Sequence, residues 1–162
     1  MADLTSFAND LAASDMSLQV ALNLWIVPTM QSIHIVAICA VVASMAMLDL
    51  RLLGVIGRGQ PVRSNARRFL KWMWIALPVL LLTGSVLIVG EPARELLSPW
   101  FWYKMTMLAI ALVLTVPLYR LIEEKPLAQH SSSSRGMLQI IGLVSLAMWL
   151  GIVFCGRWIA YG

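Results

Sequence analysis

Four long stretches of the chain are almost free of charged residues and are separated by short polar segments. They cover approximately residues 26–50, 69–90, 100–122 and 137–160. Each holds about 20 residues or more, and at a rise of about 1.5 Å per residue this is enough to cross a hydrocarbon core about 30 Å thick. Lipid offers the backbone no hydrogen-bond partner, so such segments must be helical. The pattern predicts an all-α integral membrane protein, a four-transmembrane-helix bundle in a single membrane domain over 1–162.

The first 24 residues follow a different pattern. Apolar residues recur at positions 4, 7, 8 and 11, and again at 18, 21, 22 and 25, which is the i, i+3, i+4, i+7 spacing of one helix face. Ser14 and Asp15 lie between the two groups and are typical of a helix N-cap. We therefore expect an N-terminal amphipathic interfacial region over 1–24, with one or two short helices lying on the membrane surface.

The composition agrees with a membrane protein, because 60% of the residues are hydrophobic and 12% are charged, against about 25% charged in a typical soluble domain. Lys and Arg concentrate in the first and third loops, whereas the second loop, EPARELLSP, has a single arginine between two glutamates. The positive-inside rule then places the first and third loops in the cytoplasm. Both termini are expected in the periplasm of a bacterial inner membrane. The basic residues form no arm interleaved with aromatics, so nucleic acid is not an expected partner. The basic residues of the loops placed in the cytoplasm are Arg51, Arg58, Arg63, Arg67 and Arg68 in the first loop, and Lys125 and Arg135 in the third.

His34 is the leading candidate for chemistry. It lies about eight residues, or roughly 12 Å, into the first span, where ionisable side chains usually face the bundle interior. A neutral imidazole there could ligate haem iron or copper, hydrogen-bond a quinone or relay a proton. The alternative is a packing histidine bonded to a neighbouring hydroxyl or carbonyl. A haem held by two histidines is excluded within one chain, because the other histidine, His130, lies in the predicted cytoplasmic linker.

Met30 lies one helical turn from His34 on the same face. This pair allows a haem with mixed His/Met ligation, or a Cu(I) site, since Cu(I) accepts thioether and imidazole ligands. Met45 and Cys39 are further candidates for copper. Methionine in an apolar helix more often serves packing alone.

Two further groups of polar residues lie near the ends of the spans. Lys104 and Arg157 are expected a turn or so below the outer surface, where they could bind haem propionates, a lipid phosphate or a quinone carbonyl. The alternative is snorkelling to the interface or pairing with Glu91. Asp49 and Arg51 lie at the cytoplasmic end of the first span. They form either a helix-end salt bridge or stop-transfer boundary, or a proton entry point or docking site for a cytoplasmic partner.

Several motifs carry a resemblance that covers nearly the whole chain. These are WIVP at 25–28, His34, LDLRLLG at 48–54, Lys104 and a closing stretch that ends in GRWIAY. The chain resembles a family of small bacterial four-helix inner-membrane proteins catalogued as a domain of unknown function. It is more distantly similar to copper-resistance D and cytochrome-b-like four-helix membrane proteins. That similarity implies redox chemistry or copper handling by analogy of fold.

The sequence contains no Walker loop, HExxH, GxSxG or CxxC motif, which favours a non-enzymatic protein. The leading hypothesis is an inner-membrane subunit that supports periplasmic redox or electron-transfer chemistry. It would bind haem b or quinone in an outer-leaflet pocket around His34, with Lys104 and Arg157 at the rim. Its partners would be the lipid bilayer and a periplasmic redox protein or another membrane subunit. Copper transport and a ligand-free membrane anchor or scaffold are the alternatives.

Overall fold

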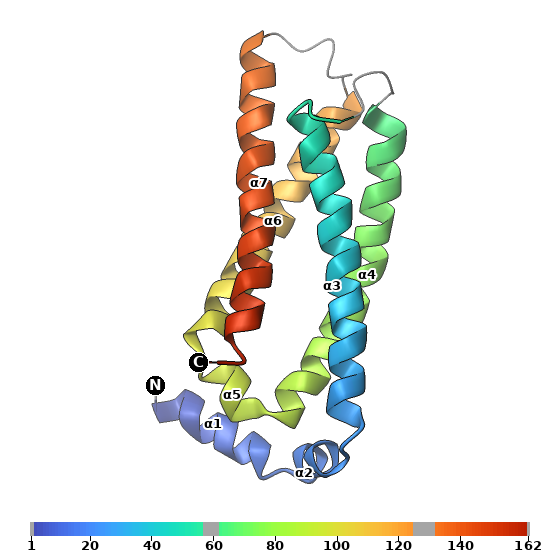
Figure 1. The fold of residues 1–162 in the computed structure, drawn as a ribbon. Helices are drawn as coiled ribbons and strands as arrows, with labels where there is room; N and C mark the ends of the chain where they lie inside the picture. The colour runs from blue at the N-terminus through green and yellow to red at the C-terminus, as the bar shows by residue number, and fades with distance from the viewer. Residues whose placement is uncertain (1, 57–61, 125–131, 162) are drawn as a thin grey trace.

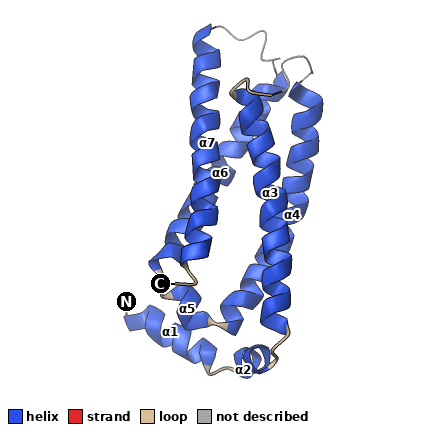
Figure 2. Cartoon of the chain, viewed as in Figure 1, coloured by secondary structure: helices blue, strands red, loops and turns tan. Residues whose placement is uncertain are grey.

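The described part of the chain is helical throughout. The computed structural model describes the backbone of residues 2–56, 62–124 and 132–161, and the side chains of residues 3–56, 69–115 and 136–161. Short loops join the helices, and no strand occurs in these ranges (Figure 2). The elements are α1 (Ala2–Ala12), α2 (Asp15–Leu22), α3 (Ile26–Leu52), α4 (Val62–Gly90), α5 (Pro92–Leu96), α6 (Pro99–Glu124) and α7 (Ser132–Trp158).

Three helices are long and apolar enough to cross a membrane, namely Ile26–Leu52, Phe69–Gly90 and Gly136–Trp158. These confirm the first, second and fourth spans predicted from the sequence. The remaining predicted span, 100–122, falls inside α6, so its helical structure is confirmed. Whether α6 also crosses the membrane stays a prediction, as does the side of the membrane on which the termini lie.

The long helices form two pairs. α3 packs along α4 and α6 packs along α7, while α3 and α7 join one pair to the other. The two pairs lie close together at the end where α3 finishes, and they diverge toward the end where α3 begins (Figure 1). Pro78 lies inside α4, and a proline in a helix interior removes a backbone hydrogen bond and bends the helix. The part of α4 that follows turns toward α5 (Figure 1).

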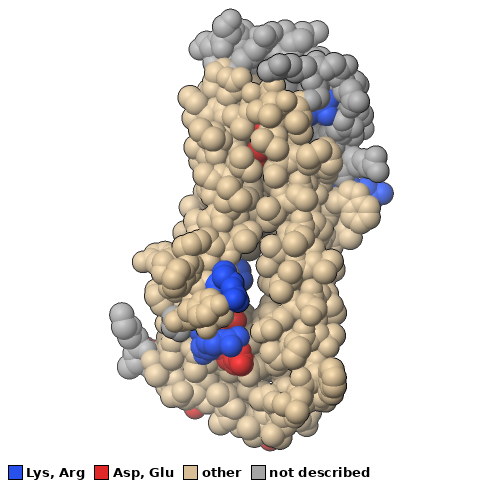
Figure 3. Space-filling view, in the orientation of Figure 1, with Lys and Arg blue, Asp and Glu red and all other residues tan. Residues whose placement is uncertain are grey.

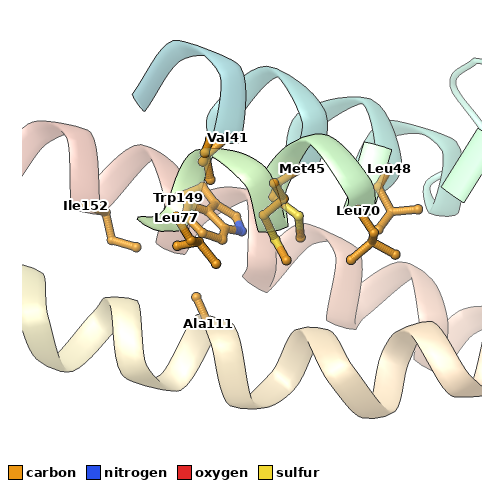
Figure 4. Packing of buried hydrophobic residues seen from close by; sticks show 10 residues of the cluster. Val41, Met45, Leu48, Leu70, Leu77, Ala111, Trp149 and Ile152 are labelled. Atoms are coloured by element: carbon orange, nitrogen blue, oxygen red, sulfur yellow. The ribbon is translucent and has the colours of Figure 1, made fainter. Parts of the chain in front are cut away.

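A single apolar core joins the four long helices. Val41 and Met45 of α3, Leu77 of α4, Ala111 of α6 and Trp149 of α7 are each at most 8% exposed. Figure 4 shows these side chains pointing toward one another from four helices. The cluster fills the bundle between the two ends and separates them with apolar side chains.

The short helices α1, α2 and α5 lie across the end of the bundle where the pairs diverge, and both chain termini are at this end (Figure 1). Ala8 of α1 is fully buried against Leu96 of α5 and residues of α6 and the C-terminal segment. In α2, the Ser17 hydroxyl donates a hydrogen bond to the carbonyl of Val89 at 2.7 Å. Ser14 caps α2 by accepting from the Ser17 backbone N–H, as predicted. The expected short N-terminal helices are therefore present; their contact with the membrane surface stays a prediction.

Candidate functional site

His34 is held by Thr83 of the neighbouring helix. The imidazole Nδ1 lies 2.7 Å from the Thr83 Oγ1, and this hydroxyl also lies 2.7 Å from the carbonyl of Val79 one turn earlier in α4. A hydroxyl has one proton to donate. When Thr83 donates it to Val79, its oxygen accepts from Nδ1–H of the imidazole. This arrangement fixes the neutral ring in one tautomer and leaves the lone pair of Nε2 available to a ligand.

The ring lies directly against the α4 backbone. A Cβ added at Gly84 would stand 3.4 Å from the Cε1 of His34, so the glycine allows this close approach. His34 is half-buried, and within the described residues its only hydrogen bond is the one to Thr83. Nδ1 therefore makes the hydrogen bond to a neighbouring hydroxyl that the packing interpretation expects, and Nε2 has no hydrogen-bond partner among the described residues.

The charge of Lys104 in α6 acts on His34. Its ammonium group is close enough to act electrostatically on His34 and on Glu95. Its methylene chain lies along α7, where a Cβ added at Gly156 would stand 3.9 Å from the Lys104 Cδ. Lys104 and His34 come from different helix pairs, and the pocket that the sequence predicts between them stays a prediction.

Glu95 of α5 is a residue whose role the sequence did not reveal. Burial raises the pKa of its carboxyl group, and the nearby positive charges of Lys104 and Arg94 partly oppose that shift. The partner expected for Lys104, Glu91, instead forms an ion pair with Arg94. Glu95 lies in a short segment between two predicted spans, and nothing in the spacing distinguished it from Glu91. The fold of α5 makes the difference, since it turns Glu95 inward.

The charged side chains line a hollow between the two helix pairs. In Figure 3, Lys and Arg side chains and acidic side chains gather in the lower half of the molecule, beside a recess between α7 on one side and α3 and α4 on the other. The helices α1, α2 and α5 lie across the end of this recess (Figure 1). The recess is therefore open sideways, toward the region that lipid would occupy.

Arg157 is placed differently from Lys104. Its guanidinium donates to the hydroxyl of Tyr161 at 2.5 Å and lies 4.8 Å from the centre of that ring. Tyr161 belongs to an aromatic cluster with Trp158 and Trp100, whose rings stack with centroids 6.0 Å apart. Arg157 is exposed, so the structure holds it on an aromatic surface at the C-terminal end of α7.

The candidate copper ligands do not converge. Met30 is half-buried one turn from His34, but Cys39 is exposed and Met45 is buried in the apolar core. Among the residues whose side chains are described, no group of three His, Cys, Asp or Glu side chains could hold a metal ion. A copper site here would depend on His34 and Met30.

Asp49 and Arg51 are both buried at the other end of α3, with 0% and 7% exposure. Neither carboxylate oxygen of Asp49 has a hydrogen-bond partner, so no hydrogen bond joins it to Arg51. The roles expected for the two residues at this helix end, including docking of a cytoplasmic partner, stay predictions.

Comparison with protein-family models finds one family, described as a family of unknown function (DUF6644), whose model matches residues 25–162. The chain belongs to this family. The matched region begins at Trp25, so it contains α3 to α7 and all the candidate site residues, and it leaves α1 and α2 outside. Comparisons with curated proteins and with solved structures find no match.

Proposed function

We propose that this DUF6644 protein binds a quinone in the outer half of a four-helix membrane bundle and supports redox chemistry at the periplasmic face of a bacterial inner membrane. The observation that carries the proposal is the Nε2 of His34, which has no hydrogen-bond partner among the described residues while Thr83 holds Nδ1. The positive charge of Lys104 acts on the same imidazole. A quinone ring carries two oxygens on opposite edges. It is therefore bound best by two polar groups that come from opposite walls of a pocket.

The two groups suit the two redox forms of such a ligand. The Lys104 ammonium is a hydrogen-bond donor and matches a quinone carbonyl, whereas the Nε2 lone pair of His34 is an acceptor and matches a quinol hydroxyl. An imidazole in this position can also accept the proton that a quinol releases when it is oxidised. Pairs of this kind bind and position the ring, and the electrons pass to or from a redox protein at the outer surface.

The shape of the site favours a ligand that arrives through the membrane. α1, α2 and α5 lie across the outer end of the recess, and the apolar core lies on its inner side. The remaining opening is lateral, between apolar helices. A polar head with an apolar tail fits this opening, because the head reaches His34 and Lys104 while the tail stays in lipid.

The other candidates fit the described residues less well. Haem b would have one imidazole ligand, His34, and a copper ion would have His34 and Met30, without a third ligand of the His, Cys or acidic type. Both remain direct outcomes of the test below. An anchor without any ligand leaves the free nitrogen of His34 without a use.

The experiment is purification in mild detergent, followed by extraction and chromatography of bound quinone, absorption spectroscopy and metal analysis. A short-chain quinone and its reduced quinol are then titrated separately into the protein while tryptophan fluorescence is followed. We expect co-purified quinone. We also expect at least about tenfold weaker quinol binding for His34→Ala and at least about tenfold weaker quinone binding for Lys104→Met, since loss of a polar contact of about 1.4 kcal/mol changes affinity tenfold. Ser85→Ala is the matched control, because Ser85 is exposed on α4 and bonds only its own helix.

A Soret band that is lost in His34→Ala would identify haem, and not quinone, as the ligand. Stoichiometric copper that is lost in the same variant would identify copper as the ligand. Protein free of all three, with no response to added quinone, would refute ligand binding and leave the anchor function.

The topology is proposed on the same basis as in the sequence: four spans, both termini periplasmic and the basic loops cytoplasmic. Reporter enzymes that are active only in the periplasm, fused at the C-terminus and in the loop around Gln60, test it. Activity of the C-terminal fusion and inactivity of the loop fusion are expected. The reverse pattern would place the His34 pocket in the cytoplasmic leaflet.

A further inference from the structure

The junction between the two helix pairs contains a carboxyl group that no contact accounts for. Asp49 of α3 is fully buried, and neither of its side-chain oxygens is hydrogen-bonded. It lies where α3 and α7 are in close contact, since a Cβ added at Gly142 of α7 would stand 3.4 Å from the Asp49 carbonyl oxygen and 3.2 Å from the Cβ of Leu52. The packing of α3 on α7 is the larger of the contacts between the α3–α4 pair and the α6–α7 pair.

The surroundings of Asp49 supply no described positive charge to balance a carboxylate. On α7, no charged residue or histidine occurs between Gly136 and Gly156. The Ser145 hydroxyl of α7 lies beside the carboxyl group without completing a hydrogen bond to either oxygen. On α4, Lys71 is exposed. On α3 itself, Arg51 follows two residues later, about 200° around the helix and therefore on a different face.

An ionised carboxylate buried without a partner costs several kcal/mol, even after the surrounding structure relaxes. A neutral carboxylic acid avoids most of this cost. The carboxyl group is also out of reach of bulk water, because its exposure is zero and α7 lies close to α3 at Gly142. We therefore expect the charged form to be favoured when α3 and α7 separate and water reaches the group.

We propose that Asp49 is a proton-binding site at the α3–α7 junction, filled when the two helix pairs are packed together and emptied when the junction opens. Proton binding involves only the carboxyl oxygen and the solvent, so no further reactant is needed. Asp49 lies 15 residues from His34, or about 22 Å along α3, and the apolar core lies between them. The proposal is therefore independent of the ligand in the outer pocket. Under it, the inner end of the bundle binds or releases a proton at Asp49.

The test uses infrared spectroscopy of the full chain in lipid nanodiscs with isotope-labelled aspartate. The chain has four aspartates, and the other three, Asp3, Asp10 and Asp15, are exposed on α1 and α2. Replacing these three by Asn leaves Asp49 as the only labelled group. At neutral pH we expect the carbonyl band of a protonated carboxylic acid, shifted by the label and absent from Asp49→Asn. A carboxylate band at neutral pH would overturn the proposal, and this measurement does not depend on a variant of Asp49 folding.

Hydrogen–deuterium exchange tests the link to the junction. As the pH is raised, after correction for the intrinsic rate, amides of α3 and α7 near Asp49 and Gly142 should exchange about tenfold faster or more, as the junction opens locally. In Asp49→Asn, which is neutral at every pH, the same amides should show no such increase. An increase of equal size in both proteins would show that another group controls the junction and would refute the proposal.

Discussion

Replacing Thr83 by valine separates the positioning of His34 from its presence. The substitution keeps the size and branching of the side chain and removes the hydroxyl that holds Nδ1 at 2.7 Å. It leaves His34, Lys104 and Glu95 unchanged. A site in which the imidazole only packs should tolerate the change, whereas a site that uses Nε2 should lose affinity, because the ring is no longer held in one tautomer and orientation.

The magnitude follows from the loss of one interhelical hydrogen bond. Such bonds in membrane proteins contribute about 0.6 kcal/mol on average and up to about 1.7 kcal/mol. Leaving a buried donor unpaired costs about 1–3 kcal/mol. Thr83 is 5% exposed and His34 is half-buried, so the lower part of this range applies. We expect the free energy of unfolding to fall by about 1 kcal/mol, and the affinity for quinol to fall about five- to thirtyfold, which corresponds to about 1–2 kcal/mol.

Thr115→Val is the matched control for this experiment. Thr115 of α6 is as deeply buried as Thr83, and its hydroxyl bonds only the carbonyl of Ala111 in its own helix, also at 2.7 Å. Both variants and the unmodified protein are compared by quinol titration in nanodiscs and by thermal unfolding in detergent. If Thr115→Val weakens quinol binding as much as Thr83→Val does, or if Thr83→Val binds quinol normally, the positioning role of Thr83 is wrong.

Three further predictions concern the frame around the site. Gly142→Ala should destabilise the bundle relative to Gly136→Ala, as measured by thermal unfolding. An added Cβ at Gly142 meets its neighbours at 3.2 Å, while the one at Gly136 meets nothing within 4 Å. Overpacking of this kind costs about 1–3 kcal/mol, against a gain of up to about 1 kcal/mol from replacing a helical glycine. Burial raises the pKa of Glu95 above its ordinary value of 4.5. The stabilisation by its protonated carboxyl group is therefore complete below that value and is lost as the pH rises through the pKa of the folded state. Unfolding temperatures measured across this pH range should fall less steeply for Glu95→Gln than for the unmodified protein. Ser17→Ala removes the hydrogen bond to Val89 and should lower local stability by about 1 kcal/mol. We expect faster deuterium exchange in α2 and in the part of α4 that it contacts. Faster exchange across the whole bundle would contradict this local role.

The hydrophobic pattern was sufficient to find the helices but not the pairs that they form. Runs without charge have a physical requirement in lipid, so the spans at 26–50, 69–90 and 137–160 could be located within a few residues. Which helices touch depends on side-chain shape over both faces, and the period of apolar residues does not report it. His34 was recognised because an ionisable group in an apolar run is unusual. Its partner Thr83 was not recognised as a partner, since a threonine in a helix commonly bonds its own backbone.

Two residues show why the polar groups were harder to interpret. Asp49 and Arg51 are two positions apart at a helix end, a spacing that places them on different faces, and the structure buries both without joining them. Glu91 and Glu95 are equivalent in the sequence, four residues apart in one short segment. Only the turn at Pro92, which starts α5 with proline at its first position, decides that Glu95 faces Lys104.

The spacing of two glycines explains how α7 can lie close to two different helices. Gly142 and Gly151 of α7 are nine residues apart, which at about 100° per residue places them on opposite faces of the helix. Gly142 allows the close approach to α3, and Gly151 allows the close approach to α6, where an added Cβ would stand 3.3 Å from the Met107 sulfur. α7 is therefore held against α3 near its beginning and against α6 nearer its end. The two helix pairs therefore diverge toward the end where α3 begins, which is the end of the bundle that holds His34 and Lys104 (Figure 1).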